Sequence, residues 1–195
     1  MISALKEEEL AGEAFSRQSA VFDELYSSNT IVNYKRQRVR NHVLTYLKPR
    51  SSILELNSGT GEDALFFASM GHHVHATDIS TGMQQVLKRK VGQAGMNELI
   101  TDEACSFTNL EELRNRGPYD AIFSNFGGLN CTARLDKVLA SLPSLLKEGG
   151  TATLVIIPPF CLWETLLMFK GQVITAFRRF FSKNGYITVI YKLGE

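Results

Sequence analysis

The feature that most constrains this chain is a short apolar segment that runs into a glycine-containing turn and then into a helix. Residues 52–56 read Ser-Ile-Leu-Glu-Leu, which is typical of a buried parallel strand. Gly59 and Gly61 follow, and glycine lets the backbone turn sharply and lets a ligand touch the main chain. A second apolar segment ends at Asp78, where doubly wound folds place a carboxylate that binds a ribose. Together these features predict a ligand at the ends of parallel strands.

The size and composition of the chain fit a single domain. Its 195 residues can bury one core and are too few for two ordinary domains. With 44% hydrophobic residues and a formal net charge of +1, the chain lacks the basic excess of a general nucleic-acid binder, so no nucleic-acid partner is expected. Cys105, Cys131 and Cys161 stand far apart, which argues against a disulfide framework or a zinc site and favours the cytoplasm.

No segment of the sequence has the pattern of a secretory signal or a membrane span. Residues 1–13 are acidic and lack the basic and then apolar order of a signal peptide. The longest apolar run, 154–163, is broken by Pro158 and Pro159 and is far shorter than the ~20 residues of a membrane-spanning helix. We therefore expect a cytoplasmic protein without stable membrane insertion.

Apolar periodicity predicts that strands and helices alternate along the chain. We expect helices over 14–47 with a break near 27–29, a strand at 52–56, a helix at 63–70 and a strand at 72–78. A helix capped by Ser80 then runs to 91, followed by a weaker strand at 98–104, a short helix at 111–115 and a strand at 119–124. The last two elements of this series are a helix at 135–146, with Pro143 as a kink or as a junction between two helices, and a strand at 151–157. This order predicts an α/β fold: a Rossmann-like, doubly wound, mostly parallel sheet with helices on both faces, in three α/β/α layers. Right-handed crossovers would bring the glycine turn, Asp78 and Asn125 to one edge of the sheet.

We expect one domain with three parts, namely an N-terminal helical cap (1–48), a cofactor-binding core (49–157) and a C-terminal helix and strand (158–195). The helix is predicted over 162–181 and the strand over 185–192. The helix either packs against the sheet or, because basic residues flank its aromatic stripe, forms a lid or a membrane-facing surface.

Two smaller patterns each allow a structural and a functional interpretation. Basic residues between 35 and 40 form either a solvated helix face or a group in which Tyr34 or Arg38 reaches over the carboxylate end of the ligand. His73 and His75 share a strand face, as a metal-binding pair would. No third ligand of a suitable type is near them in sequence, so we interpret them as packing or rim residues and predict no metal site.

A combination of motifs resembles the class I S-adenosylmethionine-dependent methyltransferases, in particular the small-molecule, type 11/25-like members. The motifs are Glu-Leu-Asn-Ser-Gly-Thr-Gly at 55–61, Asp78 after the next strand, Tyr-Asp-Ala-Ile-Phe at 119–123 and Leu-Leu-Lys-Glu-Gly-Gly at 145–150. The resemblance covers most of the chain, from Tyr34 to the end of the 151–157 strand. It implies S-adenosylmethionine as the cofactor and a small molecule as the methyl acceptor.

The resemblance also implies roles for individual residues. Glu55 would organise the turn and interact with the cofactor's amino group, and Asp78 would accept hydrogen bonds from both ribose hydroxyls. The other contacts would be Tyr34 over the carboxylate end, Asn57, Ser58, Gly59, Thr60 and Gly61 beneath the methionine and ribose, Ile79 and Met83 against the adenine, Cys105, Ser106 and Phe107 at the adenine edge, and Asn125 and Phe126 on the sulfonium side.

The chain departs from the family pattern in three places. Asn57 stands where the family usually has glycine, although asparagine tolerates left-handed backbone angles better than most residues. Cys105 and Ser106 occupy a loop where an acid is common. The family's sheet normally has two strands after the fifth, and only 185–192 is a candidate here, so we expect a shortened member or a fragment.

Methyl transfer from a sulfonium is an in-line displacement in which the cofactor carries the hard chemistry and a base is optional. No catalytic residue is assigned; His42 is a conceivable base, and Tyr26 and Tyr34 could close over the site. Residues 124–128 lack the Asn-Pro-Pro-aromatic motif of amino-methylating nucleic-acid enzymes, and Asn125 stands where a metal-dependent catechol-type site needs an acid. A small acceptor is left, and the aromatic 162–181 helix favours a hydrophobic or lipid-like one.

Two other classes of function stay open at this point. Residues 59–64 match Gly-x-Gly-x-x-Ala, a nicotinamide-dinucleotide pattern, although no tyrosine has a lysine four residues later, as the catalytic pair of short-chain dehydrogenases requires. The chain could also be a non-catalytic binding module with a methyltransferase fold, because a fold does not fix a function.

Overall fold

The computed structural model of the chain describes residues 4–157. In chain order its elements are α1 (Ala4–Ser27), α2 (Thr30–Leu44), β1 (Ser52–Leu56), α3 (Glu62–Ser69), β2 (His73–Asp78), α4 (Thr81–Ala94), β3 (Ile100–Ala104), the 3-10 helix η1 (Leu110–Glu112), β4 (Tyr119–Ser124), the 3-10 helix η2 (Gly128–Cys131), α5 (Leu135–Ser141), the 3-10 helix η3 (Leu142–Ser144) and β5 (Leu146–Leu154). The C-terminal helix and strand predicted after residue 157 lie outside the described residues.

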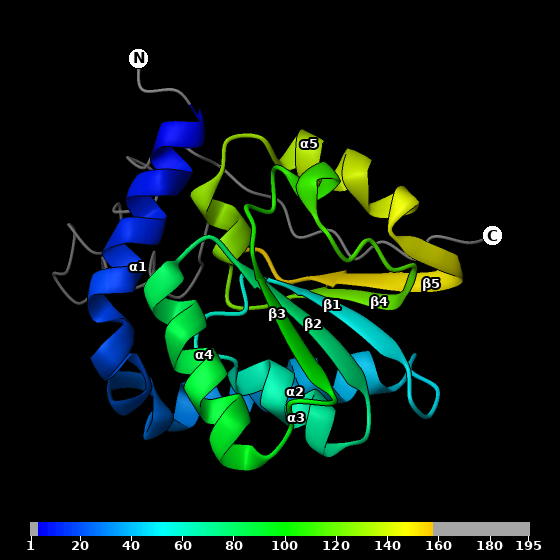
Figure 1. Cartoon of the computed structure of the whole chain (residues 1–195), viewed down its shortest axis with the longest axis horizontal. Coiled ribbons are helices and arrows are strands. Elements are labelled where there is room, and N and C mark those ends of the chain that lie inside the picture. Colours follow the sequence, from blue (N-terminus) through cyan, green and yellow to red (C-terminus); the bar gives the residue numbers. More distant parts are fainter. Residues whose placement is uncertain (1–3, 158–195) are drawn as a thin grey trace, which may run out of the picture.

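The five strands form one parallel sheet in the order β3-β2-β1-β4-β5 (Figure 1). The chain builds outward from β1 through β2 to β3, and then returns to the other side of β1 to add β4 and β5. This reversal is the switch point at which open α/β sheets bind their ligands. The predicted Rossmann-like fold is therefore confirmed.

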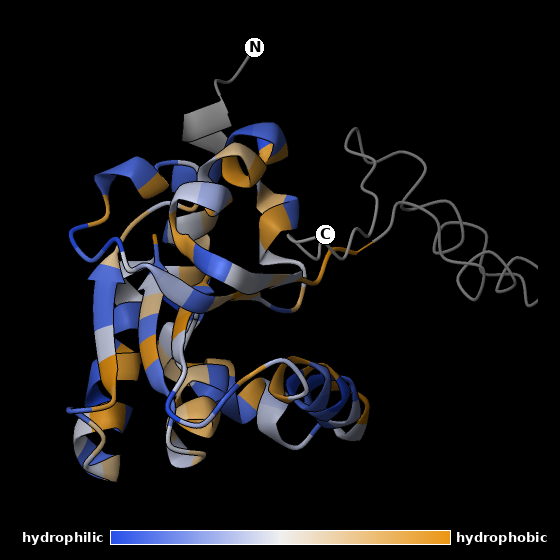
Figure 2. Cartoon of the chain, turned by 90° about the vertical axis from the view of Figure 1, so that its right-hand side faces the viewer, coloured by the Kyte–Doolittle hydropathy of each residue, from blue (hydrophilic) through white to orange (hydrophobic). Residues whose placement is uncertain are grey.

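Each face of the sheet has its own core, which explains the three layers. Along β1, Ile53 and Leu54 are both fully buried but belong to opposite cores, because successive side chains of a strand point to opposite faces. The Ile53 core includes Phe67 of α3 and Phe123 of β4. Their rings pack edge to face, with the ring centres 5.3 Å apart. The Leu54 core includes Val138 of α5. The helices carry both hydrophobic and hydrophilic residues (Figure 2), as helices with one buried face do.

The helix predicted over 135–146 is divided into two helices at Pro143, one of the two arrangements expected there, and only its C-terminal bound is wrong. α5 stops at Ser141, and Pro143 lies in the 3-10 helix that follows. Proline has no N–H to donate to the preceding turn, so the α-helix ends before it. Leu146 already belongs to β5 and pairs with Tyr119 of β4, and the next residue of β5 that pairs with β4 is Thr151. Gly149 and Gly150 therefore lie in a bulge of the strand.

α1 packs against the start of α4, and Figure 1 shows the two helices side by side. A Cβ atom on Gly82 would lie 2.7 Å from the carbonyl oxygen of Ser16, so only glycine fits at this crossing. The hydroxyls of Ser16 and Ser80 are 2.8 Å apart. One turn earlier, a Cβ on Gly12 would lie 2.9 Å from Ile79 Cγ2. These contacts hold α1 over the carboxyl ends of the strands.

Within residues 4–157, we find no helix with the length and apolar character needed to cross a membrane.

Two glycines of α4 should respond to alanine in opposite directions. We expect Gly82→Ala to reduce the free energy of unfolding by ~1–3 kcal/mol, because its methyl group would overlap the α1 backbone. The matched change Gly92→Ala adds a methyl group with no atom within 4 Å and should increase it by roughly 0.5–1 kcal/mol. Equilibrium denaturation of both variants checks this, and equal effects would contradict the close crossing.

Candidate ligand-binding site

A cavity of about 350 Å³ lies at the carboxyl ends of β1, β2 and β4, with α1 as its roof. Its volume is within the roughly 300–1,000 Å³ of small-molecule sites. The predicted site residues that line it are Glu55, Asn57, Ser58, Gly59, Thr60, Asp78, Ile79, Met83, Phe107, Asn125 and Phe126. Segments far apart in the sequence therefore converge on one cavity.

Four predicted site residues do not line this cavity. Tyr34 is 63% exposed, and its hydroxyl accepts a hydrogen bond from Arg38 on the surface of α2. Gly61, the N-cap of α3 with a φ of 81°, lies against Leu87 of α4. Cys105 is half-buried against the core, where burial raises the pKa of its thiol to about 11. Ser106 lies behind the cavity wall, where it donates a hydrogen bond to Glu8.

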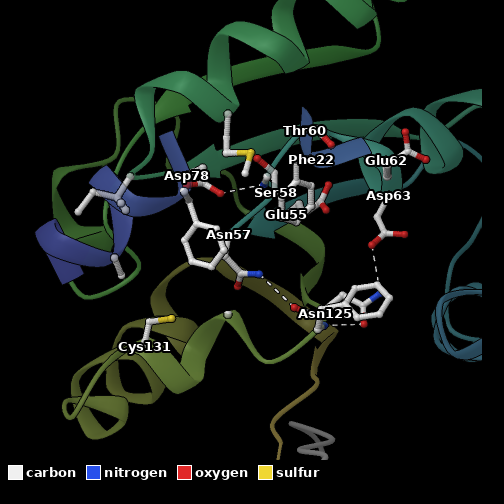
Figure 3. A pocket seen from close by; sticks show the side chains of 18 of the residues that line it. Phe22, Glu55, Asn57, Ser58, Thr60, Glu62, Asp63, Asp78, Asn125 and Cys131 are labelled. Carbon is white, nitrogen blue, oxygen red and sulfur yellow. Dashed lines mark hydrogen bonds between the residues drawn. The ribbon is translucent and has the colours of Figure 1, made fainter. Parts of the chain in front are cut away.

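Asn57 joins the glycine turn to the end of β4. It has a φ of 48°, so the left-handed backbone angle predicted for this position is present without glycine. Its Nδ2 donates to the carbonyl oxygen of Asn125 at 3.1 Å (Figure 3), and its Oδ1 accepts from the Ser124 hydroxyl at 2.5 Å. Gly59, at a φ of 56°, has no atom within 4 Å of where a Cβ would be, so a ligand can approach the backbone there.

Asp78 closes the other side of the turn. Its Oδ2 accepts a hydrogen bond from the backbone N–H of Gly59, and its Oδ1 accepts one from that of Ser80, each at 2.8 Å. Burial raises the pKa of Asp78, while these two hydrogen bonds lower it. A carboxylate has about four acceptor sites, so two remain for donors in the cavity.

A buried ionic cluster that the sequence did not suggest lies beside the turn. Asp63, only 3% exposed, accepts hydrogen bonds from Arg40 Nε at 2.6 Å and from Arg36 Nη1 at 3.0 Å. Asn125 Nδ2 donates to the same carboxylate at 3.0 Å (Figure 3). The Arg36 guanidinium also lies 4.5 Å from the centre of the Phe126 ring and faces the cavity. Arg36 and Arg40 therefore form specific, largely buried contacts. The interpretation of the basic residues between 35 and 40 as a solvated helix face does not hold for these two.

Several buried polar atoms at the cavity have no hydrogen-bond partner among residues 4–157. They are Glu8 Oε1, Glu55 Oε2 and Ser58 Oγ. Burial raises the pKa of Glu55 well above its usual range, and the charge of Asp63 raises it further, whereas Arg36 and Arg40 lower it. Buried polar groups in folded proteins are nearly always paired, so these atoms indicate a polar ligand.

The roof of the cavity is the part of the site that the sequence analysis missed. α1 contributes Glu8, Ala11, Gly12, Phe15, Phe22 and Tyr26 to the lining, and of these only Tyr26 was considered. These positions are separated by 1, 3, 4 or 7 residues, the intervals that place side chains on one face of a helix. A mostly apolar helix face that contains the acid Glu8 is the sequence signal that could have identified these residues.

Comparisons with known proteins agree on one family. A model of the family described as "Methyltransferase domain" matches residues 53–150. A demethylmenaquinone methyltransferase of Bacteroides fragilis is 30% identical over 149 residues, which cover 74% of this chain and 59% of the relative. The chain thus spans less than two thirds of the length of this curated relative.

Solved structures share the fold. The 1,6-didemethyltoxoflavin-N1-methyltransferase of Burkholderia thailandensis, solved with bound 1,6-didemethyltoxoflavin and S-adenosylhomocysteine, aligns with a TM-score of 0.60 and 18% identity over 79% of this chain and 64% of that one. The CcbJ methyltransferase of Streptomyces caelestis aligns with a TM-score of 0.52 and 26% identity over 58% of this chain and 48% of that one.

The ionic cluster should contribute strongly to stability. Asp63→Ala leaves two partly buried guanidinium groups without their carboxylate, so we expect the free energy of unfolding to fall by ~3–5 kcal/mol. The control Asp136→Ala removes an exposed ion pair with Arg134 and should change it by less than about 1 kcal/mol. Urea denaturation of both variants measures the difference. Similar small effects would show that the cluster is not a structural link.

Proposed function

The chain belongs to the class I S-adenosylmethionine-dependent methyltransferases. We propose that it transfers a methyl group from S-adenosylmethionine to a small hydrophobic acceptor. The observation that carries the proposal is the Asp78 carboxylate, which is bound to the Gly59 N–H at the wall of a cavity of about 350 Å³. A carboxylate beside an open backbone turn is the arrangement that binds a ribose and the group attached to it.

The residues around the cavity fit the chemical groups of this cofactor. Asp78 would accept from the ribose hydroxyls, and the unpaired Glu55 Oε2 and Ser58 Oγ would bind its amino-acid portion. Arg36, rather than Tyr34 or Arg38, offers a cation at the cavity for the cofactor's carboxylate. Ile79, Met83 and Phe107 offer apolar surface for the adenine. When bound, the cofactor supplies an electrophilic methyl group on a sulfonium.

The protein's own part in the reaction is to position the acceptor and exclude water. Holding the nucleophile in line with the methyl–sulfur bond converts a bimolecular reaction into an effectively unimolecular one. The α1 roof covers the cavity, and Asp23 at its far end accepts a hydrogen bond from the Thr60 hydroxyl of the turn at 2.5 Å and forms an ion pair with Lys90 of α4. α1 thus shields the reacting groups from solvent. We assign no general base.

The acceptor would enter at the α2 end of the cavity. The lining there includes Tyr26, Val32 and Phe126, two of which are partly exposed aromatic rings. Aromatic and aliphatic side chains favour a flat, largely apolar acceptor. Two similar proteins, a demethylmenaquinone methyltransferase and a 1,6-didemethyltoxoflavin-N1-methyltransferase, are named for acceptors that are ring compounds. The 162–181 helix, which suggested a hydrophobic acceptor from the sequence, lies outside the described residues.

The alternatives differ in which ligand binds. Isothermal titration calorimetry with S-adenosylhomocysteine and with NADH separates the methyltransferase from a nicotinamide-dependent oxidoreductase, and we expect only the former to bind. Family membership already disfavours the oxidoreductase. Cofactor binding without methyl transfer to any hydroquinone or heteroaromatic amine in a radiolabelled-methyl assay would favour the non-catalytic binding module.

Removal of the ribose-binding carboxylate should weaken cofactor binding. We expect Asp78→Ala to reduce the affinity for S-adenosylhomocysteine by ~1–3 kcal/mol, because charged hydrogen bonds to the hydroxyls are lost. Asp136→Ala, which changes an exposed carboxylate, should leave the affinity unchanged. Calorimetry on both variants, after circular dichroism has shown that they are folded, makes the measurement. An unaltered affinity in Asp78→Ala would refute the assigned role.

Tyr26 should affect the acceptor more than the cofactor. We expect Tyr26→Ala to raise the KM for the acceptor roughly two- to tenfold, through loss of an aromatic contact, with little change in the KM for S-adenosylmethionine. Tyr46 is similarly exposed but does not line the cavity, so Tyr46→Ala is the matched control. Steady-state kinetics with a hydroquinone acceptor provides the readout. An equal effect of both variants would place the acceptor elsewhere.

A further inference from the structure

Glu8 of α1 has one carboxylate oxygen that is fully used and one that is not. Its Oε2 accepts hydrogen bonds from the Ser106 hydroxyl at 2.5 Å and from the Thr108 hydroxyl at 2.8 Å. Its Oε1 is buried without any hydrogen-bond partner among the described residues, and the side chain, only 2% exposed, lines the cavity. An unpaired buried acceptor is costly, so this oxygen is suited to a donor that arrives with a ligand.

The carboxylate is held rigidly by the loop that follows β3. The backbone N–H of Thr108 donates to the Ser106 hydroxyl at 3.1 Å, and the hydroxyls of the two residues are 2.9 Å apart. Both hydroxyls therefore point at Glu8 Oε2 and leave Oε1 as the free acceptor. A fixed acceptor distinguishes ligands better than a mobile one, because no rotation can relieve a mismatch.

The position of Glu8 identifies which part of the ligand it faces. Gly12, one helical turn after Glu8, packs against Ile79, the residue next to Asp78. The apolar residues Ile79, Met83 and Phe107 line the same cavity. A nucleoside whose ribose is bound by Asp78 would thus direct its base between these side chains and toward Glu8.

We propose that Glu8 Oε1 accepts a hydrogen bond from the exocyclic amino group of the adenine, and so selects an amino purine over an oxo purine. The proposal rests on the function proposed above and adds a specificity-determining residue to it. Ser106 and Thr108, in the loop after β3, orient this carboxylate of α1. An oxo group at the same position of the base would place two acceptors against each other.

The test compares S-adenosylhomocysteine with S-inosylhomocysteine, which has an oxo group in place of the amino group. Calorimetry on the full chain should show that the unmodified protein prefers the adenosyl compound by ~10-fold or more, as expected for a hydrogen bond to a charged group. In Glu8→Gln the amide oxygen can still accept from Ser106 and Thr108, while the NH2 group takes the place of Oε1 and can donate to an oxo group. The preference for the adenosyl over the inosyl compound should therefore fall to within about threefold. The neighbouring exposed Glu9→Gln is the control and should keep the full preference.

The outcomes separate this inference from the proposed function. The preference is a ratio measured within each variant, so a partial loss of folded protein cancels. If Glu8→Gln retains the full preference, or if the unmodified protein shows none, the role of Glu8 is overturned while cofactor binding stands. If the unmodified protein binds neither compound, the proposed function fails and this inference fails with it.

Discussion

The carboxylate of Asp63 is the contact on which the geometry of the site depends. It stands in the first turn of α3, where a negative charge is favoured by the helix dipole, and it binds side chains from α2 and from the end of β4. One buried group thus fixes three segments relative to the glycine turn. Because separating a buried carboxylate from its cations is strongly destabilising, this pairing favours the observed position of α2 against the end of the sheet.

α1 covers the site and also contributes side chains to its lining. The glycines Gly12 and Gly82 let the helix lie close to the end of β2 and the start of α4, and its inward-facing residues then form the roof of the cavity. The same helix places an acid at one end of the cavity and aromatic side chains at the other. Its packing therefore determines both the shape and the polarity of the space available to a ligand.

The site also carries a local cost in stability. Glu8, Glu55 and Ser58 each bury a polar atom that nothing among the described residues satisfies, and burial raises the pKa of Glu55. Such groups lower the stability of the unliganded protein, and a ligand that pairs with them recovers that free energy. The unpaired atoms are concentrated at the cavity that the family and the fold indicate, which is where functional sites depart from optimal packing.

The sequence alone determined which segments form strands, where the glycine turn lies and that Asp78 ends the second strand, because apolar periodicity and backbone freedom are local properties. It misplaced the bounds of β5, which is Leu146–Leu154 rather than 151–157. Even Asn57, where the family usually has glycine, adopts the left-handed angle expected from its residue type. The tertiary structure alone decided that Glu8 and Arg36 face the cavity and that Tyr34 does not. Which distant loop the buried face of a helix meets depends on packing between segments remote in sequence, such as the crossing at Gly82 and the Asp63 cluster. A local stripe such as the one in α1 predicts that a face is buried but not what it packs against.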